Sequence, residues 1–325
     1  MRERLKQRIL FALKYLVGFL LLAWILAYID REQMFATIMN LELSVIVFVI
    51  VLAVLSLTAQ FYRWKYLVES NSIHFRAVDL IPSFFAGFAF RMMLPGGHAE
   101  ITKIFLLPGK KGGKVVAFGI EKFFQTYIKI FMVSLAFPLM FPKYRFVLWG
   151  LSGLLLLVYF FLPLMMQRAF LKKYQEREVN YHSLFFRTLI FSVAIFGGLI
   201  LQYYYLLNSV HDIGFYETSL SVIFIWGAGL LPISVSGLGV REALSVFFFG
   251  KFGIPGSSAV GLSLFLFFIN AILPALAGVY YIIKRRNDLR DAGGIFKSAA
   301  KKAIGTGKNR MVFKKYRSVL DKKSE

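Results

Sequence analysis

Charged side chains interrupt the apolar segments of this 325-residue chain, and they are the residues whose types and spacing could do chemistry. Isolated charges in apolar surroundings cost several kcal/mol, so they are normally paired or face water. The charges gather around residue 100, on the following apolar segment, and near residue 240. The residues concerned are Arg91, His98, Glu100, Lys103, Glu121, Lys122, Arg241 and Glu242.

Binding of a phosphate is the chemistry that these residue types favour. The planar fork of an arginine such as Arg241 matches two phosphate oxygens, and nearby lysines add charge. Helix N-termini after Gly97 and Gly239 would add oriented backbone N–H donors. The predicted substrate-binding residues are Arg241, Glu242, Glu100, Lys103, Arg91, Glu121, Lys122, Ser234 and Ser236.

Two of these acidic residues, Glu100 and Glu242, could instead have a structural role. They could hold their segments together by ion pairs or helix capping. Since neighbours at i and i+1 do not face each other on a helix, we expect Arg241 and Glu242 to have different partners.

Catalytic and metal-binding patterns are weak. His98 near Glu100 has no further ligand at metal spacing, and no nucleophile motif surrounds a serine that could join His211 and Asp212. The chain has no cysteine, which excludes disulfides and thiolate sites. We therefore expect no catalytic residue, no metal and no cofactor.

The apolar composition indicates that membrane-spanning helices position these charges. The chain is 58% hydrophobic and 17% aromatic, well above the apolar content of soluble domains. Apolar runs of spanning length predict an all-α, polytopic membrane protein with about six spanning helices. The predicted spans are 10–29, 43–61, 115–137, 146–165, 184–207 and 257–283.

Two further apolar segments, 81–108 and 220–249, are interrupted. The run before Pro232 would be about 18 Å long as a helix, against a bilayer core of about 30 Å. Proline and glycine then break the backbone, which survives at membrane depth only where protein or water satisfies it. We therefore predict two re-entrant helical hairpins. The breaks are expected at Pro95, Gly96, Gly97, Pro232, Gly237 and Gly239.

The distribution of basic residues predicts the topology. With a cytoplasmic N-terminus and two re-entrant segments, the inner connections hold 28 Lys or Arg and the outer ones four. The predicted first repeat, 1–145, then has the order span, span, hairpin, span, and the second, 146–286, repeats that order inverted. Such inverted repeats are common in transporters. A basic cytoplasmic tail, 287–325, follows.

The motifs at the two breaks resemble a known family. Pro232-Ile233-Ser234 and Gly237-Leu238-Gly239-Val240-Arg241-Glu242, with Leu94-Pro95-Gly96 and Glu100, are similar to the flippase-like membrane family that includes the transmembrane region of lysylphosphatidylglycerol synthase. The resemblance covers about residues 10–285. It implies movement of a polar lipid between leaflets. The chain has no room for the soluble aminoacyl-transfer domain, so lysyl transfer is not implied.

The resulting hypothesis is a lipid transporter of flippase type in the cytoplasmic membrane, with both termini in the cytoplasm and a central polar cavity. The alternatives are an intramembrane lipid-modifying transferase, with Glu100 or Glu242 as general base, or an accessory membrane subunit for a lipid-modifying enzyme. The expected partners are lipids with anionic or polar head groups, together with a possible enzyme partner. The net charge of +22 indicates topology signals and anionic lipid rather than nucleic acid. The sequence does not determine the oligomeric state.

Overall fold

The structure is a computed structural model that describes residues 16, 18–72, 76–93, 97–108, 112–168, 178–230 and 234–285. Regular structure within these ranges is helical, without strands. Five helices in the described part of the chain are long and apolar enough to cross a membrane. The predicted all-α, polytopic class is confirmed. The predicted tail, 287–325, lies outside the described residues.

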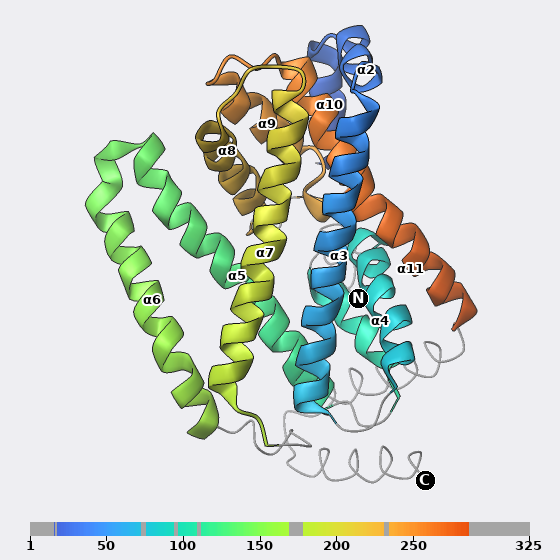
Figure 1. Ribbon diagram of the computed structural model, residues 1–325, viewed down its shortest axis with the longest axis vertical. Coiled ribbons are helices and arrows are strands. Elements are labelled where there is room, and N and C mark those ends of the chain that lie inside the picture. The colour runs from blue at the N-terminus through green and yellow to red at the C-terminus, as the bar shows by residue number, and fades with distance from the viewer. Residues whose placement is uncertain are drawn as a thin grey trace, which may run out of the picture.

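Four long helices form the frame of the molecule. They are α3 (Leu43–Asn71), α5 (Gly112–Met140), α6 (Arg145–Arg168) and α7 (Tyr181–Asn208). Their apolar sequences favour helix because a helix satisfies its own backbone hydrogen bonds in hydrocarbon. Helix α3 packs along α7, and α5 packs against α6 (Figure 1). The short turn η2 (Pro142–Tyr144) connects α5 to α6. Helix α3 continues ten residues past the end of the predicted span 43–61.

The first interrupted segment consists of α4 (Ala77–Met93) and the 3₁₀ helix η1 (Gly97–Leu106). The 17 residues of α4 rise about 25 Å, less than a bilayer core. Helix η1 folds back on α4, and Ser83 Oγ donates to the Lys103 carbonyl at 2.9 Å. Gly97 begins η1, whereas Pro95 and Gly96 lie outside the described residues.

The second interrupted segment consists of α8 (Phe215–Gly227), η4 (Ala228–Leu230), η5 (Val235–Gly237) and α9 (Val240–Gly250). Helices α8 and α9 pack together, with the rings of Phe224 and Phe248 stacked at 4.7 Å between centroids. Gly237 and Gly239 both have φ of +81°, a conformation that glycine adopts without strain. Pro232 lies outside the described residues.

The remaining helices complete the bundle. A single helical path, Gly256–Lys284, contains α10 (Gly256–Phe267), the π-helical turn η6 (Phe268–Ile272) and α11 (Leu273–Lys284). Helix α2 (Arg31–Met39) packs on α10, and the described part of the predicted first span is the helix Gly18–Tyr28.

The two largest clusters of buried apolar side chains in the described residues each include one interrupted segment. One surrounds Trp64 and Phe124, and the other surrounds Leu207 and Phe249. Trp226 of α8 packs against both clusters. It therefore lies where the two halves of the bundle meet.

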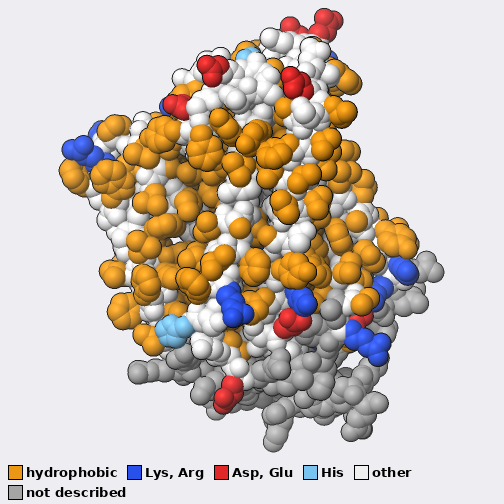
Figure 2. All heavy atoms as spheres, viewed as in Figure 1, with side chains coloured by type: hydrophobic (Ala, Val, Ile, Leu, Met, Phe, Trp, Pro, Cys, Tyr) orange, Lys and Arg blue, Asp and Glu red, His pale blue; other side chains and the backbone are white. Residues whose placement is uncertain are grey.

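The two interrupted segments lie toward opposite ends of the molecule. Figure 1 shows α4 beside the lower half of α11, whereas α8 and α9 lie near α2 and α10 at the upper end. Figure 2 shows a broad hydrophobic band over this face, acidic side chains at the upper end and a row of basic side chains near the lower end. This distribution is that of a protein whose long axis crosses a membrane.

Candidate functional site

Lys103 of η1 lies between two buried carboxylates. Its Nζ is 2.6 Å from Glu121 Oε2 on α5 and 3.2 Å from Glu100 Oε1 on its own helix. All three residues are at most 4% exposed. The ammonium also lies 3.9 Å from the centre of the Trp64 ring, which favours a cation. Lys103 therefore joins the first interrupted segment to α5.

Three further cations surround the same two carboxylates. Arg63 of α3 approaches Glu121 at 3.8 Å and donates to Ser192 Oγ of α7 at 3.0 Å. Arg91 Nε lies 3.5 Å from Glu100 Oε2, and Lys122 donates to the same oxygen. Four cations thus share two negative charges. We call these six residues, Arg63, Arg91, Glu100, Lys103, Glu121 and Lys122, the charge network.

The charge network is more accessible at one end. The side chains of Lys103 and Glu100 are 2% and 3% exposed, whereas those of Lys122 and Arg91 are 27% and 41% exposed. Buried carboxylates hold the inner cations, and the excess positive charge lies on the outer pair. An anion that reached this end would meet Arg91 and Lys122 first.

Glu242 of α9 is the centre of a second cluster and is fully buried. It accepts from the Gly239 backbone N–H at 2.7 Å, from the Arg241 guanidinium at 2.9 and 3.2 Å, and from Ser263 Oγ at 3.3 Å. The bond to Gly239 is the backbone half of a capping box. Glu242 therefore fixes both the start of α9 and the orientation of Arg241.

Arg241 lines a cavity between α7, α8 and the helical path that contains η6. Its guanidinium lies 4.4 Å from the centre of the Phe267 ring. The cavity has a volume of about 80 Å³, and Tyr203, Trp226 and Asn270 also line it. Asn270 is held by Gln202, to which its amide donates at 2.7 Å. The cavity is apolar except for these groups.

The two interrupted segments meet between these clusters. Ser236 Oγ donates to the Arg91 carbonyl at 3.3 Å, although the two residues are 145 positions apart. Lys129 of α5 lies 5.0 Å from the centre of the Trp226 ring and within electrostatic range of Arg91 and Lys122. Trp226 also lines the Arg241 cavity, so its ring connects Lys129 to the second cluster. We call Arg91, Lys122, Lys129 and Arg241 the cation row.

A family model, the lysylphosphatidylglycerol synthase TM region, matches residues 11–278. The chain belongs to this family. The match covers both interrupted segments and the cation row, and it confirms the resemblance stated from the sequence. It ties this multi-pass membrane protein to lipid handling. The search of curated proteins and the search of solved structures found no match.

In this member of the lysylphosphatidylglycerol synthase TM family, the structure brings most of the predicted binding residues together. Arg91, Glu100, Lys103, Glu121 and Lys122 form the charge network with Arg63. Arg241 and Glu242 form the second cluster, and Ser236 connects the two. Ser234 lies at the same break; its Oγ is buried and has no hydrogen-bond partner in the described part of the chain. The side chain of His98 lies outside the described residues.

One expectation about the second break is wrong. Arg241 and Glu242 were expected to have different partners, but they form an ion pair. The reason is that they lie in the first turn of α9, where the long arginine side chain folds back onto its neighbour. The carboxylates of this family member pair with cations and hold them in place.

Sequence reasoning missed Arg63, Lys129 and Trp226. Arg63 follows the predicted span 43–61, but α3 continues beyond that span and the residue is only 4% exposed. Lys129 lies within the predicted span 115–137 and was not assigned to the site. A signal was present, because Lys122, Gln125 and Lys129 are spaced by three and four residues on one face of a helix. No sequence pattern distinguishes Trp226 from the many other aromatic residues.

Proposed function

We propose that this protein is a lipid transporter of flippase type, which moves a lipid with an anionic or polar head group between the leaflets. The observation that carries the proposal is the cation row, which connects the two interrupted segments inside the bundle. Membership of the lysylphosphatidylglycerol synthase TM family supports a lipid substrate.

The balance of charge supports a phosphate ligand. The charge network and the cation row together contain six cations, and the carboxylates in contact with them are Glu100, Glu121 and Glu242. Three positive charges are therefore uncompensated among these residues. Such an excess is costly at membrane depth unless water or a ligand anion reaches it. A lipid phosphate supplies both negative charge and hydrogen-bond acceptors that suit Arg91 and Arg241.

The arrangement of the interrupted segments supports movement across the membrane rather than binding at one face. Helices α4 and α8 are each too short to cross the bilayer core, and they lie toward opposite ends of the molecule (Figure 1). In the proposed topology the first hairpin enters from the cytoplasm and the second from the exterior. Each hairpin then opens a path from one leaflet to the cation row between them, as in transporters with discontinuous helices.

The test is lipid reorientation by purified protein in vesicles that contain a labelled anionic phospholipid. We expect Arg241→Ala combined with Glu242→Gln to abolish reorientation, because the guanidinium and the carboxylate that orients it are both lost. Lys129→Gln, which leaves every ion pair described here intact, is expected to slow it about tenfold or more, as expected for a charge-assisted contact. The matched control is Arg145→Gln, an exposed arginine that lies over the ring of Phe146, 4.7 Å from its centre.

Full activity of the Arg241 and Glu242 double variant would contradict the proposal. A chemically altered lipid after incubation with candidate donors would favour the intramembrane transferase instead. Loss of a copurifying enzyme on deletion of residues 287–325, without any reorientation activity of the intact chain, would favour the accessory subunit.

A further inference from the structure

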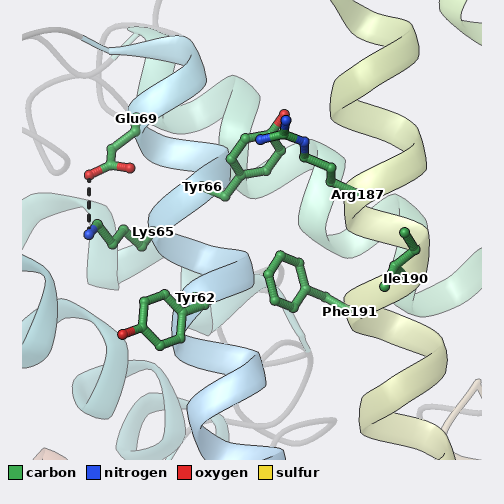
Figure 3. Close-up of a pocket in the computed structure, with 7 residues that line it drawn as sticks. All are labelled: Tyr62, Lys65, Tyr66, Glu69, Arg187, Ile190 and Phe191. Atoms are coloured by element: carbon green, nitrogen blue, oxygen red, sulfur yellow. Dashed lines mark ion pairs between the residues drawn. The ribbon is translucent and has the colours of Figure 1, made fainter.

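A groove of about 330 Å³ lies on the flank of the bundle between α3 and α7, outside the cation row. Figure 3 shows Tyr62 and Tyr66 on α3 and Arg187, Ile190 and Phe191 on α7 lining its two sides. None of these residues belongs to the charge network or to the Arg241 cavity. The groove is therefore separate from the site of the proposed transport.

One end of the groove carries charge. Lys65 and Glu69 pair at 3.8 Å across one turn of α3, so their charges offset each other. Arg187 lies over the ring of Tyr66, with the guanidinium carbon 5.3 Å from the ring centre. Arg187 has no ion pair with any residue in the described part of the chain. The rim of the groove therefore carries one positive charge without a carboxylate partner.

The other end of the groove is lined mainly by aromatic and aliphatic side chains, with the Lys65 ammonium 5.9 Å from the centre of the Tyr62 ring. Tyr62 lies four residues before Tyr66, and Phe191 lies four residues after Arg187. Each separation is a rise of about 6 Å along the helix. Figure 3 shows Tyr62 and Phe191 at one level, with Ile190 beside them and Arg187 and Tyr66 at the next level. Ile190 is 52% exposed and Tyr62 is 50% exposed, so this surface is open at the side of the bundle.

The position of the groove along the helices fits the edge of a membrane. Arg187 lies six residues after the start of α7 at Tyr181, and Lys65 lies six residues before the end of α3 at Asn71. Both therefore lie about 9 Å from the same end of the bundle. Tyrosine is enriched at this depth, where its ring contacts hydrocarbon and its hydroxyl contacts water.

A buried hydrogen bond holds together the two helices that line the groove. Arg63 and Ser192 are the neighbours of Tyr62 and Phe191, and they join α3 to α7 by a 3.0 Å hydrogen bond. Arg63 is in turn paired with Glu121. The groove walls are therefore tied together by the charge network, and a ligand would meet a site that is already formed.

We propose that this groove binds an anionic phospholipid laterally, with its phosphate on Arg187 and an acyl chain along Ile190 and Phe191. The single uncompensated charge matches a head group with one phosphate diester, such as phosphatidylglycerol. A zwitterionic choline head group would bring a second cation to a rim that holds no free carboxylate in the described residues, since Glu69 is paired. The lipid is a bound neighbour of the transporter, not the molecule that it moves.

The test is native mass spectrometry of the full-length protein in detergent, titrated with phosphatidylglycerol and with phosphatidylcholine of the same acyl chains. We expect Arg187→Gln to weaken one phosphatidylglycerol-binding event about tenfold, the effect of losing one charge-assisted contact. Arg187→Lys, which keeps the charge but loses the planar group that lies over Tyr66, is expected to weaken this event less than Arg187→Gln does. Arg145→Gln, at an exposed arginine over Phe146, is the matched control and should change nothing.

A second measurement separates the lipid from its head group. Soluble glycerol phosphate at the same concentration is expected not to displace the bound lipid, because it cannot fill the apolar end of the groove. The proposal is overturned if Arg187→Gln binds phosphatidylglycerol as well as the unchanged protein does. It is also overturned if phosphatidylcholine binds equally well, or if glycerol phosphate displaces the lipid.

Discussion

At the residue scale, the buried carboxylates hold cations in place and the outer cations remain available. Glu100 and Glu121 share Lys103 between them, and Glu242 orients Arg241 while it caps α9. This division of roles explains why acidic residues are present in a site proposed for an anionic ligand. Without them, the cations would repel one another and would lose their fixed positions.

The first prediction concerns Lys103. Lys103→Met removes the cation that two buried carboxylates share, so we expect a loss of stability of about 3–5 kcal/mol. Thermal unfolding in detergent measures the effect as a large fall in melting temperature. Lys65→Met is the control, because the partly exposed Lys65–Glu69 pair should contribute about 1 kcal/mol or less. Equal melting temperatures for the two variants would contradict the central role of Lys103.

At the element scale, the sequence predicted where helices break but not how the broken ends meet. Glycine and proline have local effects on the backbone, so Gly97, Gly237 and Gly239 could be recognised as breaks from residue type alone. The contact between Ser236 and Arg91 depends on tertiary packing and has no local signal. Arg63 shows the same limit, since its burial depends on α3 extending beyond the apolar run that predicted it.

A matched pair of glycines tests this packing. Gly237 and Gly239 share a φ of +81°, but a Cβ at Gly239 would lie 2.5 Å from the Gly18 carbonyl oxygen, whereas one at Gly237 would meet nothing within 4 Å. Gly237→Ala should therefore cost only the left-handed backbone penalty, about 1–2 kcal/mol. Gly239→Ala should cost clearly more, because the helix Gly18–Tyr28 must also shift. Thermal unfolding compares them, and equal losses would mean that this helix does not pack closely on the second break.

At the scale of the whole molecule, the account depends on which side of the membrane each connection faces. The sequence predicted this from the excess of basic residues in alternate connections, and that reasoning required both interrupted segments to return to the face they entered. In the described part of the chain, α4 lies toward one end of the molecule and α8 and α9 lie toward the other (Figure 1). The side of the membrane on which each connection lies can be measured by chemical labelling.

The absence of cysteine from the chain makes the decisive measurement simple. Single cysteines are introduced at exposed positions on both sides of each interrupted segment, and a membrane-impermeant thiol reagent is applied to sealed cells. Arg76→Cys and Pro108→Cys flank the first segment, and Asp212→Cys and Lys251→Cys flank the second. Asn40→Cys and His182→Cys, also exposed, mark the predicted outer and inner faces.

We expect Asp212→Cys and Lys251→Cys to react from outside together with Asn40→Cys. Arg76→Cys and Pro108→Cys should react only after the cells are opened, as His182→Cys does. If the two cysteines that flank either segment react from opposite sides, that segment crosses the membrane, and two paths that meet at the cation row do not exist.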